Sequence, residues 1–146
     1  MIDIDKENRI VKKIFDYEEH NEKFMMKEIY WLKYLESKWV PELIEVGPNF
    51  VSTRYYGPDC LELCKQNKLP DITEQVVEMY KFFKEKNVFK LNGSLSNLTL
   101  NGDQLVAFDF KWARERDNNT ASEIESYEKW LSKIDIDLVE RLKCMI

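Results

Sequence analysis

The sequence has 146 residues, 44% of them hydrophobic, and a formal net charge of −5, which is enough apolar material for one compact domain over residues 1–146. Its lysines are interleaved with glutamates rather than gathered into a basic stripe, and no stretch is long or apolar enough to span a bilayer, so nucleic acid and membrane are disfavoured as partners. The polar, acidic start of the chain and its three cysteines, expected to be buried reduced thiols, indicate a cytoplasmic protein.

The first strong local signal is the β-branched run Ile10–Phe15, which predicts a strand that carries Lys12 and Lys13. A helix is predicted over residues 21–37, because its apolar residues repeat at helical spacing. Glu28 lies on the apolar face of this helix. Its carboxylate would therefore point inward and would need a partner, since an unpaired buried charge is costly.

An antiparallel hairpin is predicted next. Two strand-like runs, residues 41–47 and 50–56, are joined across Gly47-Pro48-Asn49, and Gly and Pro are the strongest turn signals in a sequence. Gly57 then ends the second strand.

Two helices are expected after this hairpin. The first is short and covers residues 60–66. Asp71, with Glu74 three residues later, resembles a capping box that opens the second helix, which should end near Asn87.

A second hairpin is predicted around Asn101-Gly102, because an Asn-Gly pair between alternating apolar residues is the strongest short hairpin signal. Its strands would cover residues 98–100 and 105–108, and the second strand leads directly into Asp109. The segment from residue 121 onward has the apolar spacing of two short helices.

The order of these features resembles the protein-kinase-like superfamily from about Arg9 to Ala113. The resemblance implies an α+β class and a truncated kinase-like fold, in which residues 1–57 form a small antiparallel-sheet N-lobe plus one helix and residues 58–146 form a reduced, mainly helical C-lobe. Only nine residues precede the lysine strand and about 30 follow Ala113. We therefore expect neither a glycine-rich phosphate lid nor a peptide-docking platform.

The strand lysine of the family holds the α- and β-phosphates of ATP and is oriented by a helix glutamate. Lys12 is the best match to this lysine, and Lys13 takes its place if the register shifts by one residue. Strand alternation allows only one of them to face the cleft. Glu28 matches the helix glutamate.

The resemblance also implies an adenine site at the end of the first hairpin. Thr53 would guard the back of the pocket, and Arg54, Tyr55 and Tyr56 would form the hinge. Hinge recognition uses backbone groups, so the same residues are equally compatible with an ordinary core hairpin.

Two residues match the magnesium ligands of the family, Asn97 in the loop before the second hairpin and Asp109 in Phe108-Asp109-Phe110 after it. Both supply oxygen donors, which a hard cation requires. They lie on either side of one tight hairpin, which would bring them together. Mg²⁺ is the expected metal, with ATP as the nucleotide.

The catalytic aspartate of the family has no counterpart. Counting back from Asn97 at the family's interval places Asn92 at its position, and an alternative alignment with a short deletion places Ser94 there. Neither residue is a carboxylate. Lys111 also replaces the usual glycine after Asp109-Phe110.

The resemblance therefore implies a pseudokinase-like regulatory or binding module, of the reduced type carried by viruses and phages, that binds ATP and magnesium and is catalytically weak or inactive. Its partner would be an unidentified protein or small-molecule substrate. Self-association through aromatic residues such as Tyr127 and Trp130 is a further expectation.

Three other interpretations fit the same residues. One is a minimal kinase that transfers the γ-phosphate of ATP to a small molecule or a specific protein. Another is an interaction domain on a kinase scaffold that binds no nucleotide. The third is an unrelated α+β domain that matches the family by chance.

Overall fold

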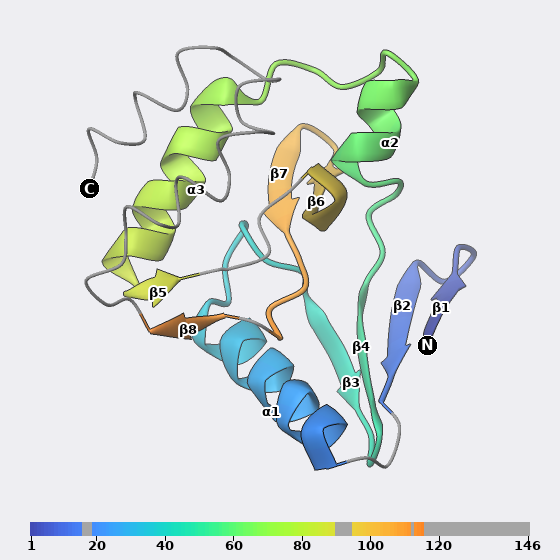
Figure 1. Ribbon diagram of the computed structural model, residues 1–146. Coiled ribbons are helices and arrows are strands. Elements are labelled where there is room, and N and C mark those ends of the chain that lie inside the picture. Colours follow the sequence, from blue (N-terminus) through green and yellow to red (C-terminus); the bar gives the residue numbers. More distant parts are fainter. Residues whose placement is uncertain (16–18, 90–94, 112, 116–146) are drawn as a thin grey trace.

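The computed structural model describes residues 1–15, 19–89, 95–111 and 113–115. Helices and strands are mixed and the strand pairs are antiparallel, so the described part is of the α+β class (Figure 1). In chain order the elements are β1 (Ile2–Asp5), β2 (Ile10–Ile14), α1 (Glu19–Tyr34), β3 (Leu43–Val46), β4 (Phe50–Arg54), α2 (Cys60–Lys65), α3 (Thr73–Glu85), β5 (Val88–Phe89), the 3₁₀ turn η1 (Leu95–Asn97), β6 (Leu98–Asn101), β7 (Gln104–Ala107) and β8 (Arg114–Glu115).

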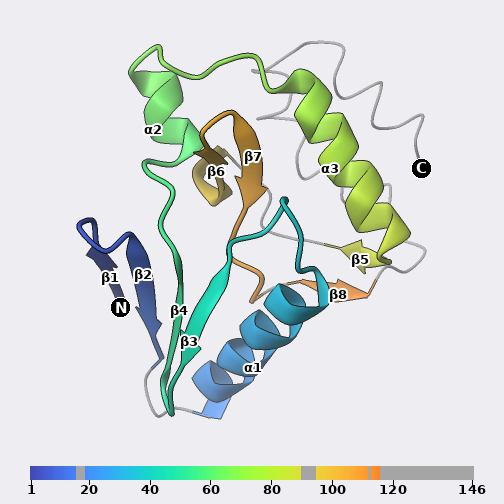
Figure 2. The same cartoon turned by 180° about the vertical axis from the view of Figure 1, so that it is seen from behind.

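The largest sheet has four strands in the order β1-β2-β4-β3, and Figure 2 shows β1 at the edge opposite β3. In the β2–β4 pairing, Lys12 lies opposite Ser52 and Lys13 lies opposite Val51. Successive side chains of a strand point to opposite faces. The two lysines therefore leave the sheet on different sides, and the Lys12 amine lies 4.2 Å from the centroid of the Phe50 ring.

Helix α1 buries one face in the core of the molecule. Trp31 and Leu32 are at most 5% exposed, and the fully buried Leu35, which directly follows the helix, lies four and three residues after them on the same face. The indole N–H of Trp31 donates a buried hydrogen bond of 3.1 Å to the backbone oxygen of Ala113. This bond joins α1 to the segment that follows Asp109.

The first predicted hairpin is confirmed as β3 and β4. The N–H of Gly47 donates to the backbone oxygen of Phe50 across 2.9 Å. A Cβ atom at position 47 would overlap the Phe50 ring, so a larger residue there would force this ring to move.

Both predicted helices are present as α2 and α3, and their first turns differ. Asp59 caps α2, because its carboxylate accepts a hydrogen bond of 2.9 Å from the Glu62 N–H. The capping box predicted at Asp71 is wrong: Asp71 accepts from the N–H of Thr73, only two residues on, at 3.0 Å. The hydrogen bonds from the Thr73 hydroxyl and N–H hold the pKa of Asp71 below its ordinary value.

The second predicted hairpin is confirmed as β6 and β7, with Asn101 paired to Gln104 and Gly102 in the left-handed region at φ 62°. The side chain of Gln75 in α3 holds this hairpin at two points. Its oxygen accepts from the Leu105 N–H at 2.7 Å, and its amide nitrogen donates to the Asp103 backbone oxygen at 2.7 Å.

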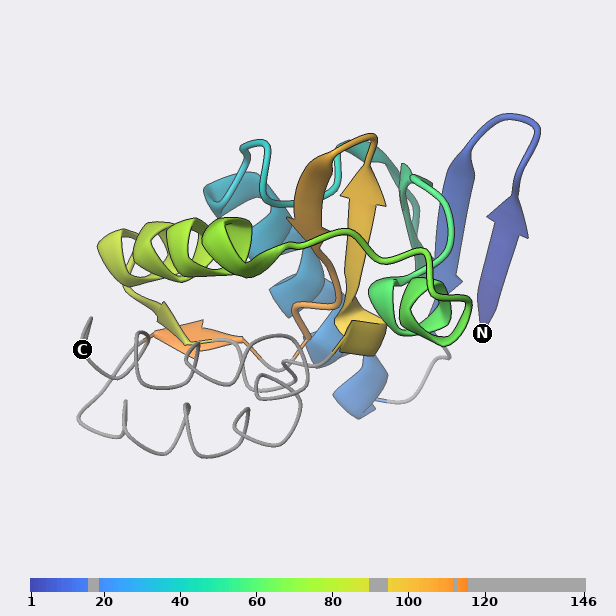
Figure 3. The same cartoon turned by 90° about the horizontal axis from the view of Figure 1, so that it is seen from above.

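Three strands were not predicted. β1 pairs with β2, and the two-residue strands β5 and β8 pair with each other through Val88 with Glu115 and Phe89 with Arg114. Figure 3 shows β5 and β8 side by side beneath α3. The helices predicted from residue 121 onward lie outside the described residues.

Of the two cysteines in the described residues, one is buried as predicted and one is not. Cys60 is 0% exposed, whereas Cys64 is exposed at the surface of α2, so the prediction for Cys64 is wrong. Cys144 lies outside the described part. Within that part, none of the helices combines the length and the apolar character that crossing a membrane requires.

Candidate functional site

A cavity of about 460 Å³ opens between the four-stranded sheet, the chain after β4 and the β6–β7 hairpin. Val11, Lys13 and Val51 line it from the sheet, and this is the face opposite to that of Lys12. Asn97 and Asp109 line it from the hairpin side. The cavity therefore collects side chains from both halves of the described chain.

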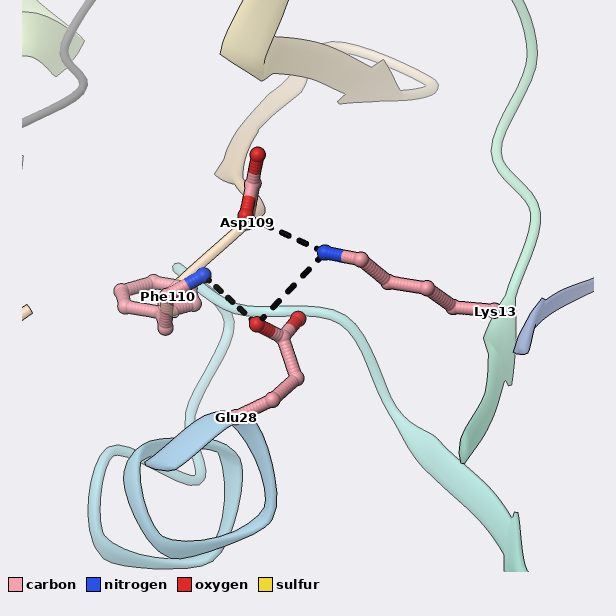
Figure 4. A network of polar contacts seen from close by, with 4 residues as sticks. All are labelled: Lys13, Glu28, Asp109 and Phe110. Carbon is pink, nitrogen blue, oxygen red and sulfur yellow. Dashed lines mark hydrogen bonds and ion pairs between the residues drawn. The ribbon is translucent and has the colours of Figure 1, made fainter. Parts of the chain in front are cut away.

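Lys13 lies at the centre of a polar network on the cavity wall (Figure 4). Its Nζ atom is 3.2 Å from Oδ1 of Asp109 and 3.9 Å from Oε2 of Glu28. The same Glu28 oxygen accepts a hydrogen bond of 2.9 Å from the backbone N–H of Phe110. The inward carboxylate predicted at Glu28 thus has a cation and a backbone donor as partners, which offsets the cost of its burial.

Of the two candidate lysines, only Lys13 contacts Glu28 and Asp109. The preference for Lys12 was wrong, because the β2–β4 register places its side chain on the outer face, over Phe50. Lys13 shares its face with the buried Phe15, whose ring centroid lies 5.7 Å from the Lys13 amine. Only one of the pair can face the cavity, as strand alternation required.

Asp109 adopts a left-handed backbone conformation, with φ of 67°. This region is uncommon for residues other than glycine, although aspartate tolerates it better than most. The next residue, Phe110, is 0% exposed, and its ring packs edge-on against Phe83 with centroids 6.1 Å apart. The buried ring anchors the chain at the point where the turn at Asp109 directs the carboxylate to Lys13.

Asn97 and Asp109 are held near each other through the backbone, because the Phe108 N–H donates to the Asn97 oxygen at 3.0 Å. Their side chains line the same cavity, so the prediction that the hairpin brings them together agrees with the structure. A carboxylate and an amide oxygen suit Mg²⁺, which takes few protein ligands and completes its shell with water and phosphate oxygens. Among the described residues, histidine, cysteine, aspartate and glutamate form no cluster of three that would hold a metal without such help.

The four predicted adenine-site residues, Thr53, Arg54, Tyr55 and Tyr56, all line the cavity. The N–H of Tyr55 donates to the Arg9 oxygen at 2.8 Å, so the turn between β1 and β2 is fixed to this segment.

The side chain of Arg54 points to other partners. It contacts the Glu42 carboxylate at 3.4 Å and the Asn8 backbone oxygen at 3.4 Å. These contacts join the end of β4 to the residue before β3 and to the turn between β1 and β2.

The lining residues that sequence reasoning missed include Ile2, Ile4 and Asp59. The two isoleucines come from β1, where Ile-Asp-Ile-Asp alternates with period two, and this is the signal that could have found them. Both side chains are more than a third exposed although they border the cavity. Asp59 adds a third carboxylate to those of Glu28 and Asp109.

The candidate catalytic positions, Asn92 and Ser94, lie outside the described residues. A comparison of the sequence with models of known protein families finds no match. A comparison with curated protein sequences also finds none.

Proposed function

We propose that this chain is a reduced member of the protein-kinase-like superfamily, that its cavity binds ATP with magnesium, and that it transfers phosphate slowly or not at all. The observation that carries the proposal is the network around Lys13. One lysine from a strand, one glutamate from a helix and one aspartate after a hairpin meet at the wall of a nucleotide-sized cavity.

Lys13 has the surroundings that a phosphate-binding lysine needs. Glu28 and Asp109 hold its amine from two sides, and the side chain is only 20% exposed, so the charge is positioned before a ligand arrives. Pre-positioned charge is the main contribution that a protein makes to phosphoryl transfer. In the proposal Lys13 takes the α- and β-phosphates, and Glu28 keeps its side chain extended toward them.

A magnesium ion would be held by Asp109 and Asn97 together with phosphate oxygens. When bound, the ion neutralises phosphate charge. The lining supports a need for this neutralisation, because Glu28 and Asp109 contact Lys13 there and Asp59 also borders the cavity. The adenine ring of ATP would lie against Thr53 to Tyr56, between that segment and the apolar side chains of Ile4 and Val11.

Weak catalysis is proposed from the sequence around the missing aspartate. Asn92 or Ser94 stands where the family has its catalytic aspartate, the general base. Neither side chain takes a proton from a hydroxyl at neutral pH. Loss of a general base typically slows a reaction about 10²- to 10⁴-fold without preventing substrate binding. A binding or regulatory role for the nucleotide-loaded protein follows.

The test is the melting temperature of the protein with ATP and magnesium together, with each alone, and with neither. A ligand at a concentration of about one hundred times its Kd adds about 2.7 kcal/mol to the free energy of unfolding. This raises the melting temperature by several degrees in a chain of this size. No shift at millimolar ATP and magnesium contradicts the proposal and favours an interaction domain or an unrelated fold. Rapid transfer of radiolabelled phosphate to the chain or to a generic substrate contradicts the weak-catalysis part alone.

A further inference from the structure

The outer face of α1 carries an exposed apolar stripe. Met26, Tyr30 and Tyr34 are 62%, 54% and 45% exposed, and their four-residue spacing places them in one row along the helix. In Figures 1 and 2 this helix lies at the periphery of the described part, with its other flank turned toward β3 and β8. Single exposed apolar residues are ordinary, but a continuous row of large ones marks a contact surface.

The two tyrosines of this row are already ordered. Their rings stack with centroids 5.9 Å apart and planes 6° apart. The Tyr34 hydroxyl donates to the backbone oxygen of Lys86 at 3.1 Å, and the Lys86 amine lies 5.7 Å from the centroid of the Tyr34 ring. Rigid tyrosines lose little conformational entropy when a partner binds, which favours affinity.

Lysines border the stripe on both sides. Lys23 and Lys27 lie on one side of the row and Lys33 on the other, and all three are exposed. Lys86 extends the positive charge beyond the end of the helix. Among the α1 side chains that the structure describes, Glu22 is the acidic member of the exposed face, and it stands four residues before Met26 at the end of the same row. The face is therefore locally basic on a chain whose net charge is −5.

We propose that the face of α1 formed by Met26, Tyr30 and Tyr34 with their bordering lysines docks an acidic, amphipathic helix of a partner protein. The apolar stripe matches the anchor row of such a helix, since both repeat at three to four residues. Glutamates beside those anchors would meet the lysines on either side and fix the register. The proposal concerns the outer face of α1 and does not depend on nucleotide binding in the cavity.

Two other occupants fit less well. Single-stranded RNA would need open aromatic faces for its bases, but Tyr30 and Tyr34 cover one face of each other. A second copy would have to present a matching acidic face. The exposed hairpin of β1 and β2 fails in this respect, because Lys6, Arg9 and Lys12 offset its acidic residues.

The probe is a fluorescently labelled peptide of about 16 residues with leucines at helical spacing and glutamates at most other positions. A control peptide keeps the glutamates and replaces the leucines with glutamine. Fluorescence anisotropy measures binding of each peptide to the wild type and to the variants Lys23→Glu/Lys27→Glu and Tyr30→Ser. The variant Lys65→Glu/Lys68→Glu is the charge control, because it changes the net charge by the same amount on a different surface. Circular dichroism confirms that each variant is folded.

We expect saturable binding of the leucine peptide, weakened about tenfold or more by Lys23→Glu/Lys27→Glu and by Tyr30→Ser, and little changed by Lys65→Glu/Lys68→Glu. Four results would overturn the proposal: no binding, equal loss in both charge variants, equal binding of the control peptide, or displacement of the peptide by oligouridylate. A fifth result would also overturn it: the wild type sediments as a dimer and Lys23→Glu/Lys27→Glu as a monomer. The face would then bind a second copy of this chain.

Discussion

The amine of Lys13 lies 3.2 Å from the carboxylate of Asp109, although 96 positions separate the two residues in the sequence. Lys13 comes from the second strand of the sheet, and Asp109 follows the β6–β7 hairpin. Both side chains are about one-fifth exposed, so the ion pair is accessible from the cavity and is not sealed in the core. A pair in this position can release its lysine to an anion that enters.

Removal of the Glu28 carboxylate should destabilise the fold. Glu28→Ala leaves the Phe110 N–H without its 2.9 Å partner in a buried position. An unsatisfied buried donor costs about 1–3 kcal/mol, and that loss is expected in the free energy of unfolding by urea. Glu22→Ala removes an exposed carboxylate from the same helix and is the matched control. Equal unfolding free energies for the two variants would show that Glu28 does not hold the segment after Asp109.

Nucleotide binding should depend strongly on magnesium. Glu28, Asp59 and Asp109 all line the cavity and would repel the phosphates unless a cation is present. Calorimetric titration with ATP should therefore show about tenfold or weaker binding when magnesium is chelated. Asp109→Asn should reduce this dependence, because it removes one carboxylate from the lining and the proposed ligand of the ion.

The matched control for this experiment is Asp103→Asn, at the exposed tip of the β6–β7 hairpin. It changes the net charge by the same amount and leaves the cavity lining intact. If the affinity for ATP depends on magnesium equally in Asp109→Asn and in the control, Asp109 is not a ligand of the ion.

The two described cysteines should differ sharply in reactivity. Burial, with a smaller contribution from Asp59, raises the pKa of the Cys60 thiol to about 12, whereas Cys64 is exposed. Iodoacetamide at mildly alkaline pH should modify Cys64 in the native protein and Cys60 only after unfolding, because the thiolate is the reactive form. Peptide mass mapping before and after denaturation measures both sites.

The same burial predicts how stability changes at alkaline pH. In the unfolded chain the Cys60 thiol ionises at its ordinary pKa, and in the native protein it stays protonated up to about pH 12. The unfolded state therefore binds fewer protons between these values, and stability falls as the pH rises through this range. Cys60→Ser should flatten this part of the curve. Comparable modification of Cys60 and Cys64 in the native state would contradict the burial on which both expectations rest.

Much of the fold was predictable because its signals are local. The Gly47 turn and the Asn101-Gly102 turn each join alternating apolar residues, and the structure confirms both hairpins. β5 and β8 were not predictable, since each has two residues and exists only through pairing with a segment far along the chain. β1 was missed because its exposed aspartates resemble a polar terminus.

Two residues of the candidate site were predictable, whereas the register of β2 was not. Glu28 and Asp109 were found from an inward helix position and from a strand end. The choice between Lys12 and Lys13 could not be made locally, because both faces of β2 carry apolar residues, with Ile10 and Ile14 on one and Val11 on the other. Only the pairing with β4, a tertiary feature, decides which lysine faces the cavity.

The most direct measurement compares Lys13→Met with Lys12→Met. Each variant loses one lysine from the same strand, and each is measured against its own melting temperature without ligand. We predict that ATP with magnesium stabilises the wild type and Lys12→Met to a similar extent and fails to stabilise Lys13→Met. Equal stabilisation of the two variants would contradict the assignment of Lys13 as the phosphate-binding residue of the cavity.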